Sequence, residues 1–262
     1  DAATHRSLAA LARETRTTLF MVLQAGIATL LHRLGSGSDI PLGTPIAGRT
    51  DDLLDDLIGL FVNTLVLRTD VSGDPAFREL LGRIREQDLE AYAHQDLPFE
   101  RLVEVLNPER SLSRHPLFQV MFTLQNTGDS ELELPGLTVA PQPVALDVSK
   151  FDLGFELSEE LTADGVQDGI DGVLRYNADL FDPDTAQSLV DRLVRVLHGA
   201  VIDPDQPVSR IPVMDAAERH RVLHDWNDTA HDVPDETLVT LLERRAALVP
   251  ERTALVFEGE SL

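Results

Sequence analysis

The chain has 262 residues, of which 43% are hydrophobic and 26% are charged, so its composition is that of a globular protein with enough apolar residues to bury a core. The formal net charge of −23 argues against nucleic-acid binding, because contacts to phosphate require clustered cations. The sequence has no run of about 18 apolar residues that would predict a membrane span, and its lack of cysteine excludes disulfides and thiolate metal sites, which fits a cytoplasmic protein.

The first fifty residues predict two helices and a strand. A short amphipathic helix is expected from Ser7 to Arg16, and Thr17 or Thr18 can cap a longer helix that ends at Gly35. The Gly-Ser-Gly-Ser segment at 35–38 then predicts a turn. Residues 39–49 (DIPLGTPIAGR) predict a strand that leads into a glycine-rich bend.

The next stretch, residues 58–68 (IGLFVNTLVLR), is apolar on both of its faces. Such a run predicts a strand covered on both sides, at the centre of a core rather than at its edge. Asn63 and Thr64 are its only uncharged polar residues. A buried amide at Asn63 needs partners, so it either ties down neighbouring backbone or faces a cavity through which a substrate passes.

The remaining pattern predicts helices followed by strands. Helices are expected from near Pro75 to about Gln95 and again from Pro98. Alternating apolar residues predict strands over 118–124, 151–158 and 170–176, with a proline-containing, acidic excursion over 127–149 and a final helix that opens at Asp182. Together these elements predict an α/β fold of the α+β kind, a mixed sheet with flanking helices, over residues 1–202.

The composition changes after residue 202. Residues 203–235 are rich in proline and aspartate and are expected to form a linker with one short helix around 216–224. Residues 236–262 predict a helix, a strand and a turn, but 27 residues cannot enclose a core of their own. The chain is therefore expected to include the start of a second domain.

Other chemistry finds little support in the sequence. His220 and His224 have a spacing that could bring two imidazoles to one metal, but the segment lacks the His-Glu-x-x-His pattern, so no metal site is expected. No Gly-x-Ser-x-Gly elbow exposes a serine nucleophile near His115. Lys150 is the only lysine, which excludes a P-loop.

Several segments, taken in order, resemble the C-terminal half of condensation domains of nonribosomal peptide synthetases. These segments are DIPLGTPIAGR, IGLFVNTLVLR, AYAHQDLPFERLVEVL and RSLSRHPLFQVMFTLQN, followed by KFDLGFEL and LRYNADLFD. The tail from WNDTAHDV onward resembles the linker and first strand of an adenylation domain. The resemblance divides the chain into a C-terminal lobe (1–202), a linker (203–235) and an incomplete adenylation start (236–262).

The resemblance implies a chloramphenicol-acetyltransferase-like lobe that pairs with an N-terminal lobe. Donor and acceptor carrier proteins present phosphopantetheine arms between the two lobes, and the acceptor amine attacks the donor thioester to form an amide. No cofactor is expected to bind this chain directly, and ATP and magnesium would serve only the adenylation domain. The family's His-His-x-x-x-Asp-Gly motif belongs to the N-terminal lobe, and this sequence has no adjacent histidines, so no catalytic residue is expected in it.

Site residues follow from the same motifs. The resemblance places Arg49 at the interlobe site, where it would pair with the aspartate of the catalytic motif; the alternative is a surface arginine paired with Asp51 or Asp52. The other candidates for a tunnel or interlobe position are Asn63, Thr64 and Gln119. The remaining motif residues are expected to have structural roles: His94, Gln95, Asp96, Pro98, Phe99, Arg114 and Pro116.

Three functions stay open at this point. The chain is part of a peptide-bond-forming domain, part of a heterocyclisation domain, or a non-catalytic lobe on which carrier proteins or tailoring enzymes dock; an adenylation-like tail disfavours epimerisation. An isolated lobe should also expose the apolar face that its partner lobe covers, so self-association is expected.

Overall fold

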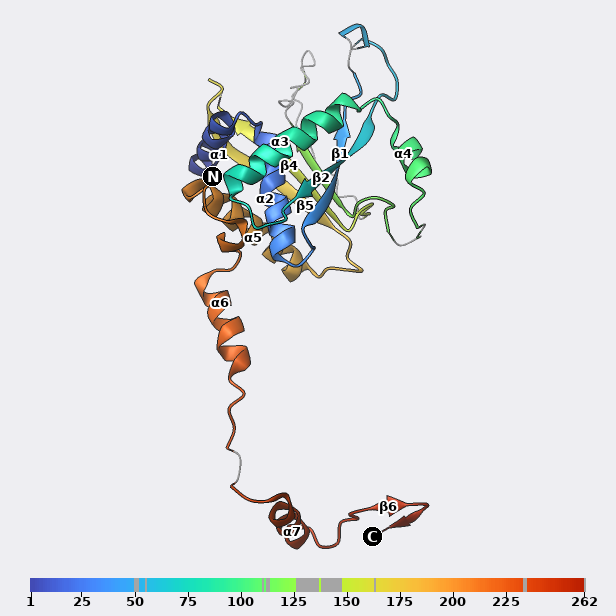
Figure 1. Ribbon diagram of the computed structural model, residues 1–262, viewed down its shortest axis with the longest axis vertical. Coiled ribbons are helices and arrows are strands. Elements are labelled where there is room, and N and C mark those ends of the chain that lie inside the picture. Colours follow the sequence, from blue (N-terminus) through green and yellow to red (C-terminus); the bar gives the residue numbers. More distant parts are fainter. Residues whose placement is uncertain are drawn as a thin grey trace. The chain divides into compact units, whose positions relative to one another are not determined.

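The computed structural model describes residues 1–49, 52–54, 56–109, 111, 114–125, 137, 148–162, 164–232 and 235–261. The chain divides into two compact units, Asp1–Asp215 and Ala216–Leu262 (Figure 1). Most of the excursion predicted over 127–149 lies outside the described residues, as does Asp51.

Among the described residues, a five-stranded mixed sheet organises the first unit, with strand order β2-β1-β3-β4-β5. Its strands are β1 (Asp39–Ile46), β2 (Asn63–Asp70), β3 (Val120–Gln125), β4 (Leu153–Leu161) and β5 (Gln167–Tyr176). β1, β3 and β4 run parallel to one another, while β2 and β5 pair antiparallel at the two edges. The predicted mixed sheet with flanking helices is confirmed.

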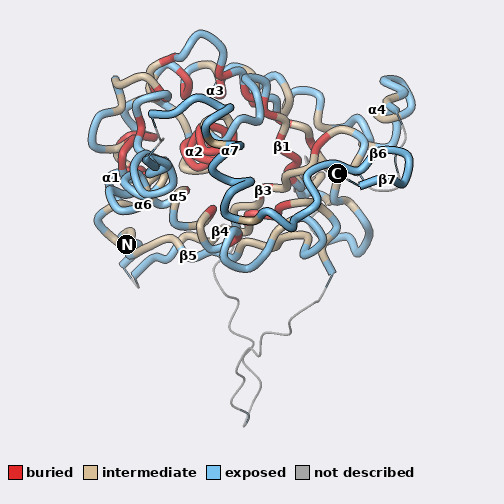
Figure 2. The backbone as a smooth tube through the Cα atoms, turned by 90° about the horizontal axis from the view of Figure 1, so that it is seen from below, coloured by how far each residue is buried: buried red, intermediate tan, exposed pale blue. Residues whose placement is uncertain are grey.

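Four helices cover one face of this sheet: α1 (Ala2–Thr15), α2 (Leu19–Arg33), α3 (Phe77–Ala93) and α5 (Pro183–Ile202) (Figure 2). A fifth helix, α4 (Phe99–Leu106), has no buried residue. Every residue from Met21 to Leu31 of α2 is buried, so this helix lies at the centre of the core. The predicted caps are confirmed, since Thr18 accepts a hydrogen bond from the amide of Met21 and Asp182 accepts one from that of Thr185.

The prediction for residues 58–68 is wrong in two respects. β2 begins only at Asn63, and it is an edge strand rather than a central one. The exposed fractions of Ile58, Leu60 and Val62 are 106%, 93% and 61%. Hydrophobic pattern reports that a segment is apolar, not what covers it, and an exposed interface segment has the same pattern as a buried strand.

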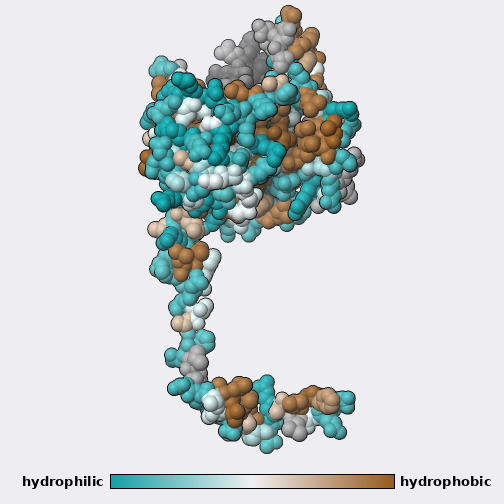
Figure 3. All heavy atoms as spheres, viewed as in Figure 1, coloured by the Kyte–Doolittle hydropathy of each residue, from teal (hydrophilic) through white to brown (hydrophobic). Residues whose placement is uncertain are grey.

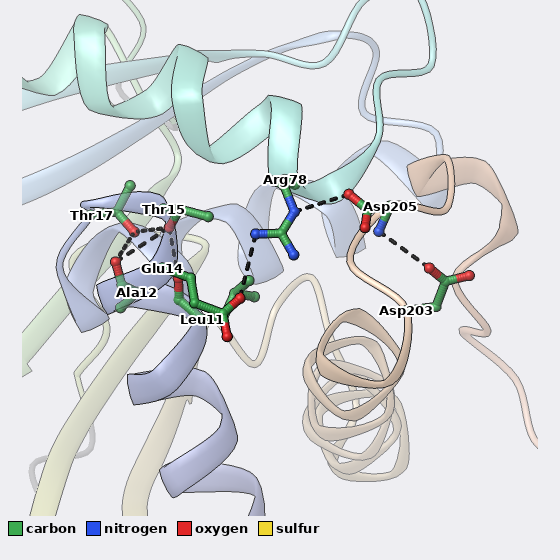
Figure 4. A network of polar contacts seen from close by, with 8 residues as sticks. All are labelled: Leu11, Ala12, Glu14, Thr15, Thr17, Arg78, Asp203 and Asp205. Carbon is green, nitrogen blue, oxygen red and sulfur yellow. Dashed lines mark hydrogen bonds and ion pairs between the residues drawn. The ribbon is translucent and has the colours of Figure 1, made fainter.

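Residues 203–215 belong to the first unit, although their composition predicts a linker. Val208 and Ile211 are completely buried in its core. The amide of Arg78 donates to the carbonyl of Pro204, and the Arg78 guanidinium bridges Glu14 (3.5 Å) and Asp205 (2.9 Å) (Figure 4). The segment includes a 3₁₀ turn, Val208–Arg210, and belongs to the first unit by its contacts.

The second unit contains α6 (Ala216–Leu223), a 3₁₀ turn (Asp225–Asn227), α7 (Leu238–Leu248) and a hairpin of β6 (Val256–Phe257) with β7 (Glu260–Ser261). The two predicted helices are present. Neither α6 nor α7 has a buried residue, and most of the apolar side chains along α7 and both of those in β6 are exposed. In the part of the chain that the structure describes, no helix is long and apolar enough to cross a membrane.

Candidate functional site

A pocket lined by polar and apolar residues in equal number opens where the three parallel strands end. Because β1, β3 and β4 run in one direction, their carboxyl ends meet at one edge of the sheet, which is where open α/β sheets bind ligands. The start of α2 and the end of α3 complete the walls, and the pocket has a volume of about 420 Å³. It is lined by Thr18, Leu19, Phe20, Thr44, Pro45, Ile46, Tyr92, Thr123, Leu124 and Glu159.

Glu159 provides the only carboxylate among these lining residues. Its Oε1 lies 3.0 Å from Nε2 of His5, a side chain that is only 1% exposed in α1. This contact fixes the carboxylate at the pocket wall. Burial, and after it the nearby charge of Asp88, raise the pKa of Tyr92 to about 12, so its hydroxyl remains protonated and able to donate a hydrogen bond at neutral pH.

A buried polar cluster lies behind Tyr92 and joins α2, β2 and α3. Nε2 of Gln24 donates to Oγ1 of Thr69 (3.2 Å) and to Oδ1 of Asp88 (3.1 Å), and all three residues are at most 1% exposed. Burial raises the pKa of Asp88 to about 6. The sequence analysis missed this cluster, although Asp88 falls on the apolar stripe of its helix, four residues after Ile84.

The Asn63 side chain ties down backbone. Its Nδ2 donates to the carbonyls of Gln95 (2.9 Å) and Leu97 (2.8 Å), and its Oδ1 accepts from the amide of Phe99 (3.1 Å). Asn63 therefore joins the start of β2 to the connection between α3 and α4. These three bonds are of the kind that the structural alternative for this amide predicts, and the substrate-facing alternative stays a prediction.

Arg49 holds the loop between β1 and β2. Its Nη2 donates to the carbonyl of Leu57 (2.7 Å), and its guanidinium lies 4.4 Å above the ring of Phe61. Gly48 has a positive φ of 64°, and a Cβ there would overlap the carbonyl oxygen of Phe61. Arg49 and Gly48 therefore hold the exposed apolar segment at residues 57–62 in place. Asp51 and the Asp52 side chain, the alternative partners of Arg49, lie outside the description.

The register of the sheet separates Gln119 from the other two predicted site residues in the sheet, Asn63 and Thr64. Asn63 pairs with Ile46 and Thr64 with Pro45 at the end of β1 that borders the pocket. Gln119 precedes Val120, which pairs with Leu42, so it lies roughly 13 Å away along the sheet. Its Nε2 donates to the carbonyl of His115 (2.9 Å), a local contact.

His115 lies in an aromatic cluster with Phe99, Phe118 and Phe151, and its ring centroid is 4.1 Å from that of Phe118. Burial lowers the pKa of His115, which favours a neutral ring. Through Phe99, this cluster joins the first turn of α4 to Phe118 and Phe151, which shortly precede β3 and β4. The motif residues therefore contact one another through Phe99.

The other motif residues lie around these contacts. Pro98 is the N-cap of α4 and His94 the C-cap of α3, and the carbonyl of Gln95 accepts from Asn63. The exposed ones are His94, Asp96, Pro98, Arg114 and Pro116.

The histidine pair in the second unit has its own partner. The rings of His220 and His224 are 4.8 Å apart, and Nε2 of His220 lies 3.4 Å from Oδ1 of Asp225. Within the described ranges, no group of three or more His, Asp or Glu residues could hold a metal ion.

Comparison with known proteins gives consistent matches. The family model of the condensation domain matches residues 1–223. The chain is 52% identical, over 98% of its length, to the dimodular nonribosomal peptide synthase of Bacillus subtilis (strain 168), of which it covers 11%. The chain thus spans about a tenth of this curated relative.

Two solved structures superpose well on this chain. The X-domain from teicoplanin biosynthesis superposes with a TM-score of 0.77 at 39% identity, over 82% of this chain and 48% of that one; its complex with OxyB is also solved. The four-domain nonribosomal peptide synthetase AB3403, bound to AMP and glycine, superposes with a TM-score of 0.78 at 26% identity, over 100% of this chain and 20% of that one.

Proposed function

The chain belongs to the condensation domain family, and from that premise we propose that residues 1–215 are the C-terminal lobe of a domain that joins carrier-bound thioesters through an amide bond. The lobe would form one wall of the reaction site. A second lobe would carry the histidine motif, because this sequence has no two adjacent histidines.

The observation that carries this proposal is the exposed apolar segment at residues 57–62. The side chains of Ile58 and Leu60 are almost fully exposed, yet Arg49 and Gly48 hold the segment in a defined position. Figure 3 shows apolar surface on the side of the unit that carries this segment and α4. A rigid apolar surface is typical of an interface. A second lobe is a fitting partner, since the chain matches about half of the X-domain chain.

The proposed reaction is aminolysis of a thioester. The amine of the acceptor attacks the carbonyl carbon of the donor, a C–N bond forms, and the C–S bond to phosphopantetheine breaks with release of its thiol. The phosphopantetheine arms belong to donor and acceptor carrier proteins. This chain would supply one wall of the channel, with Arg49 at the lobe interface, while residues 236–262 would begin an adenylation domain that uses ATP and magnesium.

A hybrid domain tests this proposal. We would join the chain to the N-terminal condensation lobe of the Bacillus relative and supply loaded donor and acceptor carriers, with mass spectrometry of the product. We expect product from the hybrid, but not from the chain alone or from a hybrid without the motif histidines. Product from the chain alone, or a folded but inactive hybrid beside an active Bacillus domain, would contradict the proposal.

A second candidate is a non-catalytic platform for another protein. It is favoured by one observation, the higher identity to the X-domain (39%) than to the AB3403 synthetase (26%). The X-domain forms a complex with OxyB. Titration of OxyB against the chain, with the X-domain as positive control, separates the two candidates: binding together with an inactive hybrid would favour the platform.

A further inference from the structure

The strand-end pocket, at the carboxyl ends of β1, β3 and β4, lies beside the proposed lobe interface. Ile46 lines this pocket, pairs with Asn63 across the sheet, and stands three residues before Arg49 in the chain. Asn63 directly follows the exposed apolar segment at residues 57–62. A molecule held in the strand-end pocket would therefore lie next to the surface at which a second lobe closes the reaction site.

Glu159 has the only charged side chain among the residues that line this pocket. Its Oε1 lies 3.0 Å from Nε2 of the buried His5, which anchors the carboxylate, while its Oε2 has no hydrogen-bond partner among the described residues. The Glu159 side chain remains 26% exposed. Because a carboxylate accepts hydrogen bonds and cannot donate them, Oε2 can take an N–H or O–H donor whichever charge the His5 ring carries.

The charges at the pocket do not favour an anion. The lining residues include no lysine, arginine or histidine, and the whole chain has a formal net charge of −23. The start of α2 also borders the pocket, but a helix N-terminus contributes only about half a positive elementary charge. The pocket therefore suits an amine, which donates N–H both neutral and protonated, better than a carboxylate or a phosphate.

The other lining groups suit the remainder of an aminoacyl group. The hydroxyl of Tyr92 can donate to a carbonyl oxygen, and the side chains of Phe20 and Leu124 give the pocket apolar walls. Its volume of about 420 Å³ is in the usual range for small-molecule sites. In the reaction proposed above, the acceptor must present a free amine, whereas the donor presents the carbonyl of its thioester.

We propose that the strand-end pocket binds the free amine of the acceptor aminoacyl group, which donates a hydrogen bond to Oε2 of Glu159. This inference rests on the proposed function and names the substrate that this wall of the site receives. An amine held here is placed beside the lobe interface, from which it can approach the donor carbonyl.

The test compares leucinamide with isocaproamide, which has the same body but no amine. Binding to the full chain would be measured by protein-detected NMR titration at about pH 7. We expect both probes to shift signals of the lining residues, with leucinamide about fivefold tighter, as one net hydrogen bond gives. Equal affinity of the two probes, tighter binding of isocaproamide, or no binding of either would overturn the proposal.

Variants of two neighbouring carboxylates assign the preference to one of them. Glu159→Gln keeps the size of the side chain and an oxygen that can accept from His5, but it replaces the free acceptor oxygen by an NH₂ donor. It should abolish the preference for leucinamide and leave isocaproamide binding unchanged. Glu160→Gln is the matched control, because it makes the same change of charge at an exposed residue that does not line the pocket. Far-UV circular dichroism confirms folding, and a preference that survives in folded Glu159→Gln would refute the site.

Failure of this site and failure of the proposed function give different results. Product from the hybrid domain, together with equal affinity of the two probes, would refute the amine site alone. A preference for leucinamide in a chain whose folded hybrid is inactive would refute the proposed function, and with it the assignment of the amine to an acceptor.

Discussion

Replacement of Asn63 by alanine is the sharpest test of how the family motif supports the fold. The change removes both hydrogen bonds to the carbonyls of Gln95 and Leu97 and the acceptor for the amide of Phe99. A typical hydrogen bond contributes about 1 kcal/mol net, and the bond to Leu97 is exposed and counts for less. We therefore expect a loss of about 2 kcal/mol in the free energy of unfolding.

For a unit the size of Asp1–Asp215, this loss corresponds to a decrease in Tm of about 4–8 °C. Thermal unfolding by circular dichroism measures it, and hydrogen exchange should become faster at the amide of Phe99. Asn227→Ala is the matched control, because that side chain donates to the carbonyl of Val222 within the second unit. A Tm within 1–2 °C of the unmodified chain, by the same scale, would refute the structural role and restore Asn63 as a substrate-facing residue.

Three further predictions follow from the same contacts. Burial raises the pKa of Asp88 to about 6, so the folded state binds this proton more tightly than the unfolded state, and ionisation of Asp88 destabilises the fold as pH rises from about 4 through 6. Asp88→Asn should therefore add up to about 3 kcal/mol to the free energy of unfolding at pH 8 and nothing near pH 4. A loss of stability of this variant at pH 8 in thermal melts would contradict the prediction. Gly48→Ala should displace the loop that Arg49 contacts and speed tryptic cleavage after Arg49. The control is Gly37→Ala, where φ is positive but the space is open, and it should lower the free energy of unfolding by only about 1 kcal/mol. Equal rates of proteolysis of the two variants would count against the loop contact. The double variant Ile58→Ser with Leu60→Ser should change the free energy of unfolding by less than about 0.5 kcal/mol, because both side chains are exposed. It should nevertheless reduce self-association of the chain and product formation by the hybrid domain. Unchanged light scattering and unchanged activity would show that this segment is not part of the interface.

The sequence alone determined the secondary structure wherever the signal is local. The caps at Thr18 and Asp182, the apolar stripe of α3 and the alternation in β4 all depend on residues a few positions apart, and each element is present near its predicted bounds. The order of motifs also identified the family and the mixed sheet. α1 begins at Ala2 rather than near Ser7, because Asp1 caps it.

Tertiary structure alone decided which apolar and polar residues are covered. Ile58 and Leu60 have the pattern of a buried strand but are exposed, whereas Val208 and Ile211 lie in a segment with the composition of a linker but are buried. Asp88, 64 residues from Gln24, and His5, 154 residues from Glu159, acquire their character from partners that local pattern does not reveal. The physical reason is that periodicity reports which face of an element is apolar, while burial and pKa depend on what the fold brings against that face.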